Sequence, residues 1–145
     1  MTCPMDAPRP ASNEHWDLVA TLSISSLYLT TNQTYRGHCQ LIFDARHATS
    51  PVELSAAEWT TYCTDLRAAQ RAIVGVVQPD HLNIELLGNV VPHLHWHVIP
   101  RYRTDPRWGQ PIWSTPLSAM PATRLEPADR EALLAELRSA LTARG

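Results

Sequence analysis

Residues 93–97 read His-Leu-His-Trp-His, and this alternation limits local structure more than any other feature of the chain. Side chains of a β-strand point alternately to opposite faces. A strand here would place three imidazoles on one face and Leu94, Trp96 and Val98 on the other. A helix, with about 3.6 residues per turn, would scatter the imidazoles around its axis. The pattern therefore predicts a strand that carries three nitrogen bases on one side and packs into a core on the other.

Such an array can attack phosphorus, relay protons or bind a metal ion. A purely structural role is hard to reconcile with it, because each buried imidazole needs partners for both ring nitrogens. A metal site is the more serious alternative, since His-x-His on a strand supplies two facial ligands. However, no Cys-x-x-Cys or His-Glu-x-x-His accompanies the array, and the cysteines at positions 3, 39 and 63 are far apart. We expect no metal at the imidazoles, although ligands that converge from distant segments keep this alternative open.

The stretch Gly-Asn-Val-Val-Pro-His-Leu-His-Trp-His-Val-Ile-Pro-Arg, residues 88–101, resembles the signature of the histidine triad family. The resemblance extends to Asn-Gln-Thr-Tyr-Arg-Gly-His at residues 32–38 and to a strand-to-helix passage at residues 46–58. It covers residues 15–113, most of the chain. The Pro100-Arg101 ending resembles the fragile-histidine-triad branch and bacterial diadenosine polyphosphate hydrolase-like members.

The resemblance implies a nucleotide hydrolase or transferase that cleaves the α-phosphate linkage of dinucleoside polyphosphates. It places the nucleophile, which forms a covalent nucleotidyl-histidine intermediate, at the middle histidine, His95. It implies that His97 contacts the α-phosphate and leaving group, that His93 orients its neighbours, and that His38 supports the triad strand. A neutral imidazole, with a reference pKa of about 6.5, suits this attack. The alternatives are a nucleoside phosphoramidate hydrolase and a low-turnover nucleotide-binding or signalling protein.

The resemblance also indicates residues that hold the substrate. Asn32 resembles an asparagine that meets the ribose hydroxyls, and Asn83 resembles a strand residue that contacts the α-phosphate. Glu85 competes with Asn83 for that position, because the following segment is shorter than in many family members. A loop whose amides approach phosphate corresponds to Gly88, Asn89, Val90 and Val91. Cations for the distal phosphates are offered by Arg101, Arg103 and Arg107.

Cofactors and partners follow from the same resemblance. No cofactor is expected at the triad, and Mg²⁺ is expected only together with a polyphosphate substrate. Some relatives have an amino-terminal metal knuckle near Cys3, but Cys-Pro-Met at residues 3–5 departs from it, so we expect no zinc there. Family members pair as homodimers, which implies a homodimer here. For Trp108 and Trp113 three roles stay open: contact with the second subunit, lining of the nucleobase pocket, or core filling.

Composition excludes several other classes. The net charge of −2 with neutral histidines lacks the basic footprint of a nucleic-acid-binding protein. No stretch approaches the ~18 apolar residues of a membrane helix, and no apolar run near the start indicates a signal peptide. Three cysteines without a paired spacing suggest a reducing compartment. We therefore expect a cytoplasmic enzyme that acts on a small nucleotide, with no nucleic-acid or membrane partner.

The remaining patterns predict an α+β fold in one domain over residues 14–145, preceded by a loose, proline-containing arm at residues 1–13. Ser55 and Glu58 form a capping box that predicts a long helix over 56–77, and Pro127 begins a carboxy-terminal helix over 127–143. Strands are expected at 16–31, as one bent strand or a hairpin, and at 38–43, 82–87 and 94–101. These elements predict an antiparallel sheet of about five strands with the long helix on one face, the fold that the resemblance implies.

Overall fold

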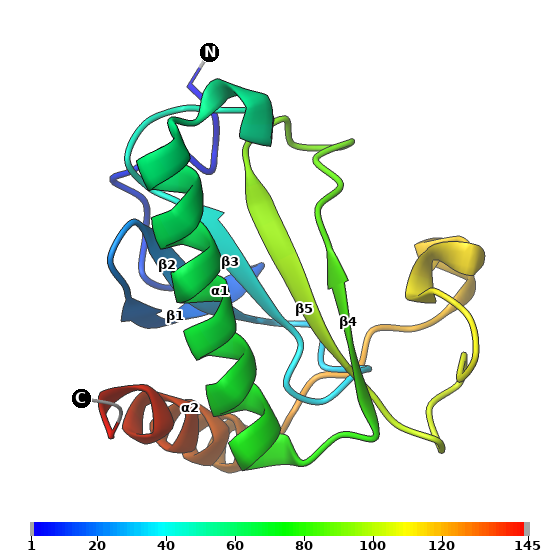
Figure 1. The fold of residues 1–145 in the computed structure, drawn as a ribbon. Helices are drawn as coiled ribbons and strands as arrows, with labels where there is room; N and C mark the ends of the chain where they lie inside the picture. Colours follow the sequence, from blue (N-terminus) through cyan, green and yellow to red (C-terminus); the bar gives the residue numbers. More distant parts are fainter. Residues whose placement is uncertain (1, 144–145) are drawn as a thin grey trace.

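Five strands form one sheet in the computed structural model, which describes residues 2–143 (Figure 1). The strands are β1 (Trp16–Thr21), β2 (Ser25–Thr30), β3 (Cys39–Phe43), β4 (His81–Glu85) and β5 (His95–Arg101). Their spatial order is β1-β2-β3-β5-β4, and every neighbouring pair is antiparallel. The predicted α+β fold with about five antiparallel strands is confirmed. Residue 1 of the expected arm and residues 144–145 of the expected domain lie outside the described residues.

Two helices complete the fold. Helix α1 (Ala56–Val77) has the predicted bounds, and the predicted capping box forms at its start. Ser55 Oγ accepts a hydrogen bond from the Glu58 amide at 3.1 Å, and the Glu58 carboxylate accepts one from the Ser55 amide at 2.8 Å. Helix α2 (Pro127–Thr142) begins at the predicted proline and ends one residue before the predicted end. Figure 1 shows α1 lying across one face of the sheet, with α2 packed against α1 and β1. None of the described helices is long and apolar enough to span a bilayer.

The strand bounds differ slightly from the predicted ones. The segment 16–31 is a hairpin, with a register shift between Leu18 and Ala20 in β1. Strand β4 ends at Glu85 rather than at residue 87, because the chain then leaves the ladder and turns at Gly88, whose φ is +69°. Strand β5 begins at His95, one residue later than expected. These shifts leave the predicted faces of β5 unchanged.

The main core lies between the sheet and the two helices. Leu94 and Val98 are buried in it, and Trp96 packs against it beside Trp59 and Tyr62 of α1. This confirms the predicted inward face of the triad segment. Further buried members come from the sheet and both helices: Leu27, Leu29, Leu41, Phe43, Leu66, Ile73, Leu133 and Leu137.

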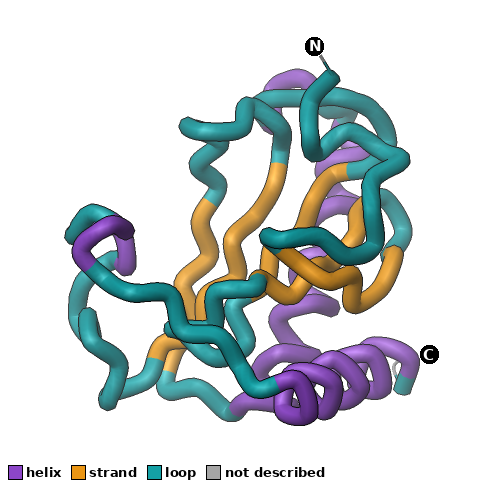
Figure 2. The backbone as a smooth tube through the Cα atoms, turned by 180° about the vertical axis from the view of Figure 1, so that it is seen from behind, coloured by secondary structure: helices purple, strands orange, loops and turns teal. Residues whose placement is uncertain are grey.

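The opposite face of the sheet is crossed by loops instead of α1, as Figure 2 shows from behind. Two small apolar clusters lie apart from the main core. One comprises Met5, Trp16, Tyr28 and Ile42, and the other Tyr35, Ile99 and Ile112. Through Met5, which is 5% exposed, the amino-terminal segment contacts the sheet. The predicted looseness of the arm concerns its motion and stays a prediction. The histidines of β5 therefore lie beneath a layer of loops.

Candidate active site

Strand β5 places two of the predicted triad histidines side by side. The ring centroids of His95 and His97 are 5.1 Å apart, and both side chains are buried on the face away from α1. His93 precedes the strand, and its ring lies 5.3 Å from that of His47. The three histidines therefore form a pair on β5 and a third imidazole beside the loop that follows β3.

A backbone hydrogen bond determines the tautomer of His95. Its Nδ1 lies 2.7 Å from the carbonyl oxygen of His93. A carbonyl oxygen only accepts, so Nδ1 carries the proton and Nε2 carries the lone pair. His93 thus orients His95 through its main chain rather than through its ring. The arrangement leaves Nε2 of His95 as a base or nucleophile.

His38, directly before β3, contacts one of the two strand histidines, as the resemblance implies for a buttressing residue. Its Nε2 is 3.2 Å from Nδ1 of His97, and the two rings lie 5.4 Å apart. The turn before β3 positions it: the Gln33 side chain donates to the His38 carbonyl at 3.1 Å and accepts from the Gly37 amide at 2.8 Å. Gly37 has φ +92°, and a Cβ there would lie 3.1 Å from both Pro100 and Val77.

Burial keeps these imidazoles neutral. Desolvation, with a smaller contribution from the charge of His97, lowers the pKa of His38 to about 3. Desolvation and the neighbouring His95 lower the pKa of His97 to about 4. The pKa of His95 is also lowered, mainly by desolvation. All three side chains are therefore unprotonated at neutral pH, the state in which an imidazole can attack or accept a proton.

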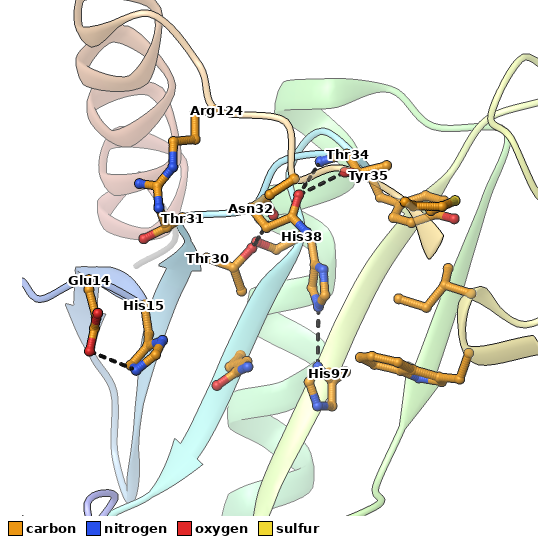
Figure 3. A pocket seen from close by; sticks show the side chains of 15 residues that line it. Glu14, His15, Thr30, Thr31, Asn32, Thr34, Tyr35, His38, His97 and Arg124 are labelled. Atoms are coloured by element: carbon orange, nitrogen blue, oxygen red, sulfur yellow. Dashed lines mark hydrogen bonds and ion pairs between the residues drawn. The ribbon is translucent and has the colours of Figure 1, made fainter. Parts of the chain in front are cut away.

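A cavity of about 380 Å³ lies beside His38 and His97 (Figure 3). Asn32 lies on its wall, and its Oδ1 accepts hydrogen bonds from Thr34 Oγ at 2.7 Å and from the Thr123 amide at 3.1 Å. The structure thus brings the predicted ribose-binding asparagine to the same cavity as His38 and His97. The other lining side chains are largely polar or aromatic: Glu14, His15, Thr30, Thr31, Tyr35, Gln40, Ile112, Trp113, Met120, Ala122 and Arg124.

Trp113 is a site residue whose place the sequence left open. Its ring lies edge-on to His97, with centroids 5.4 Å apart, and its Nε1 donates to the Glu85 carboxylate. Glu85 lies directly opposite His97 in the β4–β5 ladder. Of the two candidates for the strand position beside the triad, Glu85 is therefore the one across from His97, and Asn83 is opposite Ile99. Asn83 and Glu85 point to the same face of β4, so the alternation of the strand does not distinguish them, and only the register shows which one lies opposite His97.

Arg101 holds a loop together. Its five guanidinium N–H groups all have acceptors within the chain, two of them on the Asp105 carboxylate at 2.9 and 3.0 Å. The others reach Asn83 Oδ1 and the carbonyls of Arg107 and Gln110 at 2.6–2.7 Å. A phosphate would have to displace one of these bonds, so the geometry offers no support for the predicted contacts of Arg101 and Asn83 with substrate.

Of the predicted phosphate loop, only Gly88 lines a cavity together with His95. Gly88 lines a small cavity, about 150 Å³, together with His93, His95 and residues 49–51. Val90 is 93% exposed, and Val91 packs against the cluster around Trp16. Asn89 has no side-chain hydrogen bond that ties it to the histidines among the described contacts. Of the other predicted cations, Arg103 stacks over Trp108 at 5.5 Å and pairs with Asp80 at 3.7 Å.

Comparison with known proteins agrees with this architecture. The model of the HIT domain family matches residues 15–104, more than half of the chain. The fold is similar to that of a histidine triad protein from Bradyrhizobium japonicum, with a TM-score of 0.80 and 24% identity over 88% of this chain and 92% of that one. A histidine triad protein from Marinobacter aquaeolei VT8 is similar with a TM-score of 0.79 and 21% identity over 90% and 92% of the two chains.

A more distant neighbour has a TM-score of 0.67 and 19% identity over 88% of this chain and 85% of that one. It is a hypothetical histidine triad nucleotide-binding protein from Sulfolobus tokodaii strain 7. Comparison with curated proteins gave no match. At these identities the solved structures support the fold, whereas the domain match over residues 15–104 carries the family assignment.

Proposed function

The chain belongs to the HIT domain family, and on this premise we propose that it is a nucleotide hydrolase or transferase that cleaves the α-phosphate linkage of dinucleoside polyphosphates. One observation carries the proposal. His95 has its Nδ1 proton held by the His93 carbonyl and its pKa lowered by burial, which leaves a neutral Nε2 lone pair at neutral pH. This is the state that a nucleophilic histidine needs.

The reaction divides into two displacements at the α-phosphorus. Nε2 of His95 attacks the phosphorus, the bond to the bridging oxygen breaks, and the remaining nucleotide leaves with that oxygen. Water then attacks the same phosphorus, the P–N bond breaks, and a nucleoside monophosphate is released. In the first step the leaving oxygen takes up a proton, and in the second step the incoming water gives one up. We assign the exchange of these protons to His97, which lies beside His95 and within hydrogen-bond distance of His38.

The cavity beside His97 supports binding of a nucleoside. Its volume, about 380 Å³, falls in the range of small-molecule sites, and Asn32 supplies an amide for the ribose hydroxyls. Tyr35 and Trp113 line the same cavity and offer aromatic surface for a base. Binding of nucleotides is also the property named for the Sulfolobus tokodaii relative.

We further propose that the chemistry at His95 and His97 needs no metal, and that Mg²⁺ acts only on the polyphosphate. We also propose that the chain forms a homodimer, as the family resemblance implies. We propose a reducing cytoplasm as its compartment, which suits the free thiols at positions 3, 39 and 63. The alternative functions are a phosphoramidate hydrolase, which would use the same nucleophile, and a nucleotide-binding protein with little turnover.

The experiment is a substrate panel analysed by product chromatography: diadenosine polyphosphates, adenosine phosphoramidate and adenylyl-lysine compounds. We expect release of AMP from at least one diadenosine polyphosphate, and an acid-labile nucleotidyl adduct on the protein in quenched mass spectra. His95→Ala should abolish turnover and adduct while nucleotide binding, measured by calorimetry, remains. His81→Ala, at an exposed histidine of β4, is the matched control and should keep full activity.

Each other outcome selects a different function. Turnover of phosphoramidates alone favours the first alternative, and nucleotide binding without turnover favours the second. Near-normal activity of His95→Ala would remove His95 as the nucleophile. Absence of both binding and turnover across the panel would refute a nucleotide substrate altogether.

A further inference from the structure

A half-buried carboxylate faces His97 from the neighbouring strand without bonding to it. Glu85 of β4 is paired with His97 in the ladder, and directly opposite side chains lie on the same face of a sheet. The Glu85 carboxylate instead accepts a hydrogen bond from Nε1 of Trp113, the one hydrogen bond that this carboxylate makes among the described residues. An ionised carboxylate has no donor for a phosphate and repels its charge. Glu85 is therefore unsuited to the α-phosphate contact that the sequence suggested for this strand.

Trp113 reaches Glu85 from a short helix in the segment after β5. This 3₁₀ helix, η2 (Ile112–Ser114), is fixed to the sheet by Ile112, which is buried in one of the small apolar clusters. The direction of the indole then depends on Nε1, which only donates and needs an acceptor when it leaves water. Glu85 supplies one, whereas the buried Nε1 atoms of Trp16 and Trp96 have no partner among the described residues. The fold thus tolerates unpaired indoles elsewhere but orients this one.

The bond between Glu85 and Trp113 lies between two cavities. Trp113 and His97 line the cavity of about 380 Å³, and the indole edge contacts the His97 ring. Glu85 lines a second cavity, about 900 Å³, which extends along β4 and does not include His97. The hydrogen bond joins the two walls, so the pair separates His97 from the larger cavity.

We propose that Glu85 is a positioning residue for the nucleotide reaction: its carboxylate holds the Trp113 indole against His97 and so keeps the water of the larger cavity away from this imidazole. The inference rests on the proposed function, in which His97 exchanges protons with the leaving oxygen and the incoming water. Glu85 acts through Trp113 and does not touch the reacting atoms. A dry imidazole exchanges its proton with the substrate rather than with bulk water, which is what the two displacements require.

Other titratable groups also face His97 from the elements packed around it. His95 lies beside it on β5, and Nε2 of His38 is 3.2 Å from its Nδ1. The wall of the same cavity carries three more charged or titratable residues: Glu14, His15 and Arg124. The pKa of His97 is lowered by desolvation and, to a smaller extent, by His95, and the charge of Glu85 is not among the causes. This agrees with an influence of Glu85 through the indole.

The two ways in which Glu85 can act on His97 have opposite signs. A carboxylate that acts directly by its charge favours the imidazolium, so its removal would lower the pKa of His97. A carboxylate that acts by holding Trp113 keeps water out, so its removal admits water and raises the pKa of His97 towards that of a free imidazole. The direction of the change therefore identifies the mechanism.

The test is an NMR titration of the histidine side chains in the ligand-free chain, over the pH range in which circular dichroism shows it folded. His97→Gln assigns the His97 signals. Glu85→Leu removes the acceptor, and the pKa of His97 should rise from about 4 towards 6.5. Glu85→Gln keeps an acceptor oxygen without the charge and should retain the wild-type value. Trp113→Phe keeps a ring without the donor and should reproduce the shift of Glu85→Leu.

A double variant and a control complete the experiment. Glu85→Leu combined with Trp113→Phe should shift His97 no further than either single change, because each breaks the same bond. Glu131→Leu, at an exposed glutamate of α2, is the matched control and should not shift it. In each variant, the acid decline of kcat/KM should move in the same direction as the pKa of His97. Trp113→Phe tests the same bond if Glu85→Leu does not fold.

Two results would overturn the proposal. One is an unchanged or lowered pKa of His97 in folded Glu85→Leu or Trp113→Phe. The other is a shift in Glu85→Gln as large as that in Glu85→Leu, which would assign the effect to the charge. The titration uses no nucleotide, so unchanged His97 with normal turnover refutes the role of Glu85 alone. Absence of nucleotide binding and turnover refutes the reaction itself and, with it, this role.

Discussion

At the level of single residues, the neutral state of the histidine pair determines how activity depends on pH. An imidazole is a nucleophile only above its pKa, and burial lowers the pKa of His95 and lowers that of His97 to about 4. We expect the acid decline of kcat/KM for the best substrate to be centred below 6.5, the pKa of an unperturbed imidazole. The apparent pKa belongs to the coupled pair. Measuring kcat/KM against pH, with folding monitored by circular dichroism, tests this.

A variant at Trp113 tests the physical cause of this prediction, and a variant at Trp108 is its control. Its ring shields His97, and desolvation is the largest cause of the lowered pKa of His97. Trp113→Ala admits water, so the acid decline should move up towards 6.5. Trp108→Ala, at a tryptophan that is 41% exposed and stacked under Arg103, should not move it. An acid decline centred at or above 6.5 in the wild type would contradict this explanation.

The sequence predicts some of these residues and not others. The alternation of residues 93–97 with the Asn-Gly-His segment is enough to place His38, Asn32 and the β5 histidines at one site. The position of Glu85 depends on the register of β4 against β5, and that of Trp113 on the course of the chain after β5; no local pattern encodes either. For Arg101, an arginine after a triad suggests phosphate binding, but its guanidinium is taken up by Asp105, four residues on, and by Asn83 of β4.

Among the elements, the loop after β5 depends on one buried ion pair. The side chains of Arg101 and Asp105 are 4% and 3% exposed, and the arginine also binds two loop carbonyls. Arg101→Ala leaves a buried carboxylate without its partner, so we expect the free energy of unfolding to fall by about 3–5 kcal/mol. Urea denaturation measures this. The matched control is Arg103→Ala, whose side chain is 76% exposed and whose loss should cost less than about 1 kcal/mol.

The loop and α1 show why elements differ in how well sequence predicts them. Helix α1 has its own start signal in Ser55 and Glu58 and a continuous apolar stripe, so its bounds follow from local sequence. The loop over residues 102–111 has no such signal. Its shape comes from hydrogen bonds to Arg101, which belongs to a different element. A small decrease in stability for Arg101→Ala, below about 1 kcal/mol, would mean that the loop is held by other contacts.

For the whole molecule, buried histidines predict a loss of stability in acid. The pKa of His38 is about 3 and that of His97 about 4 in the folded chain, against 6.5 for an unperturbed imidazole. Below pH 6.5 the unfolded chain therefore binds more protons than the folded one, and acid favours unfolding. The loss begins near pH 6.5 and continues down to the folded pKa values. Each such histidine contributes at most about 1.4 kcal/mol per pH unit.

Urea titrations at several pH values between neutral and mildly acid test this prediction. His38→Gln removes one titrating group and should make the dependence of unfolding free energy on pH less steep, even if the variant is less stable at neutral pH. His81→Gln, at an exposed histidine, should leave the slope unchanged. Equal slopes in the wild type and His38→Gln would show that carboxylates alone cause the acid loss.

The order of strands in the sheet also has a consequence for synthesis of the chain. Strands β1, β2 and β3 are consecutive and pair locally, but the neighbour of β3 on its other side is β5, which follows α1 and β4. While the ribosome makes residues 44–94, β3 has an open hydrogen-bonding edge flanked by apolar side chains, including Leu41 and Phe43. A nascent chain stalled in this interval exposes an edge prone to aggregation. The segment that carries the histidines is therefore also the one whose arrival closes the sheet.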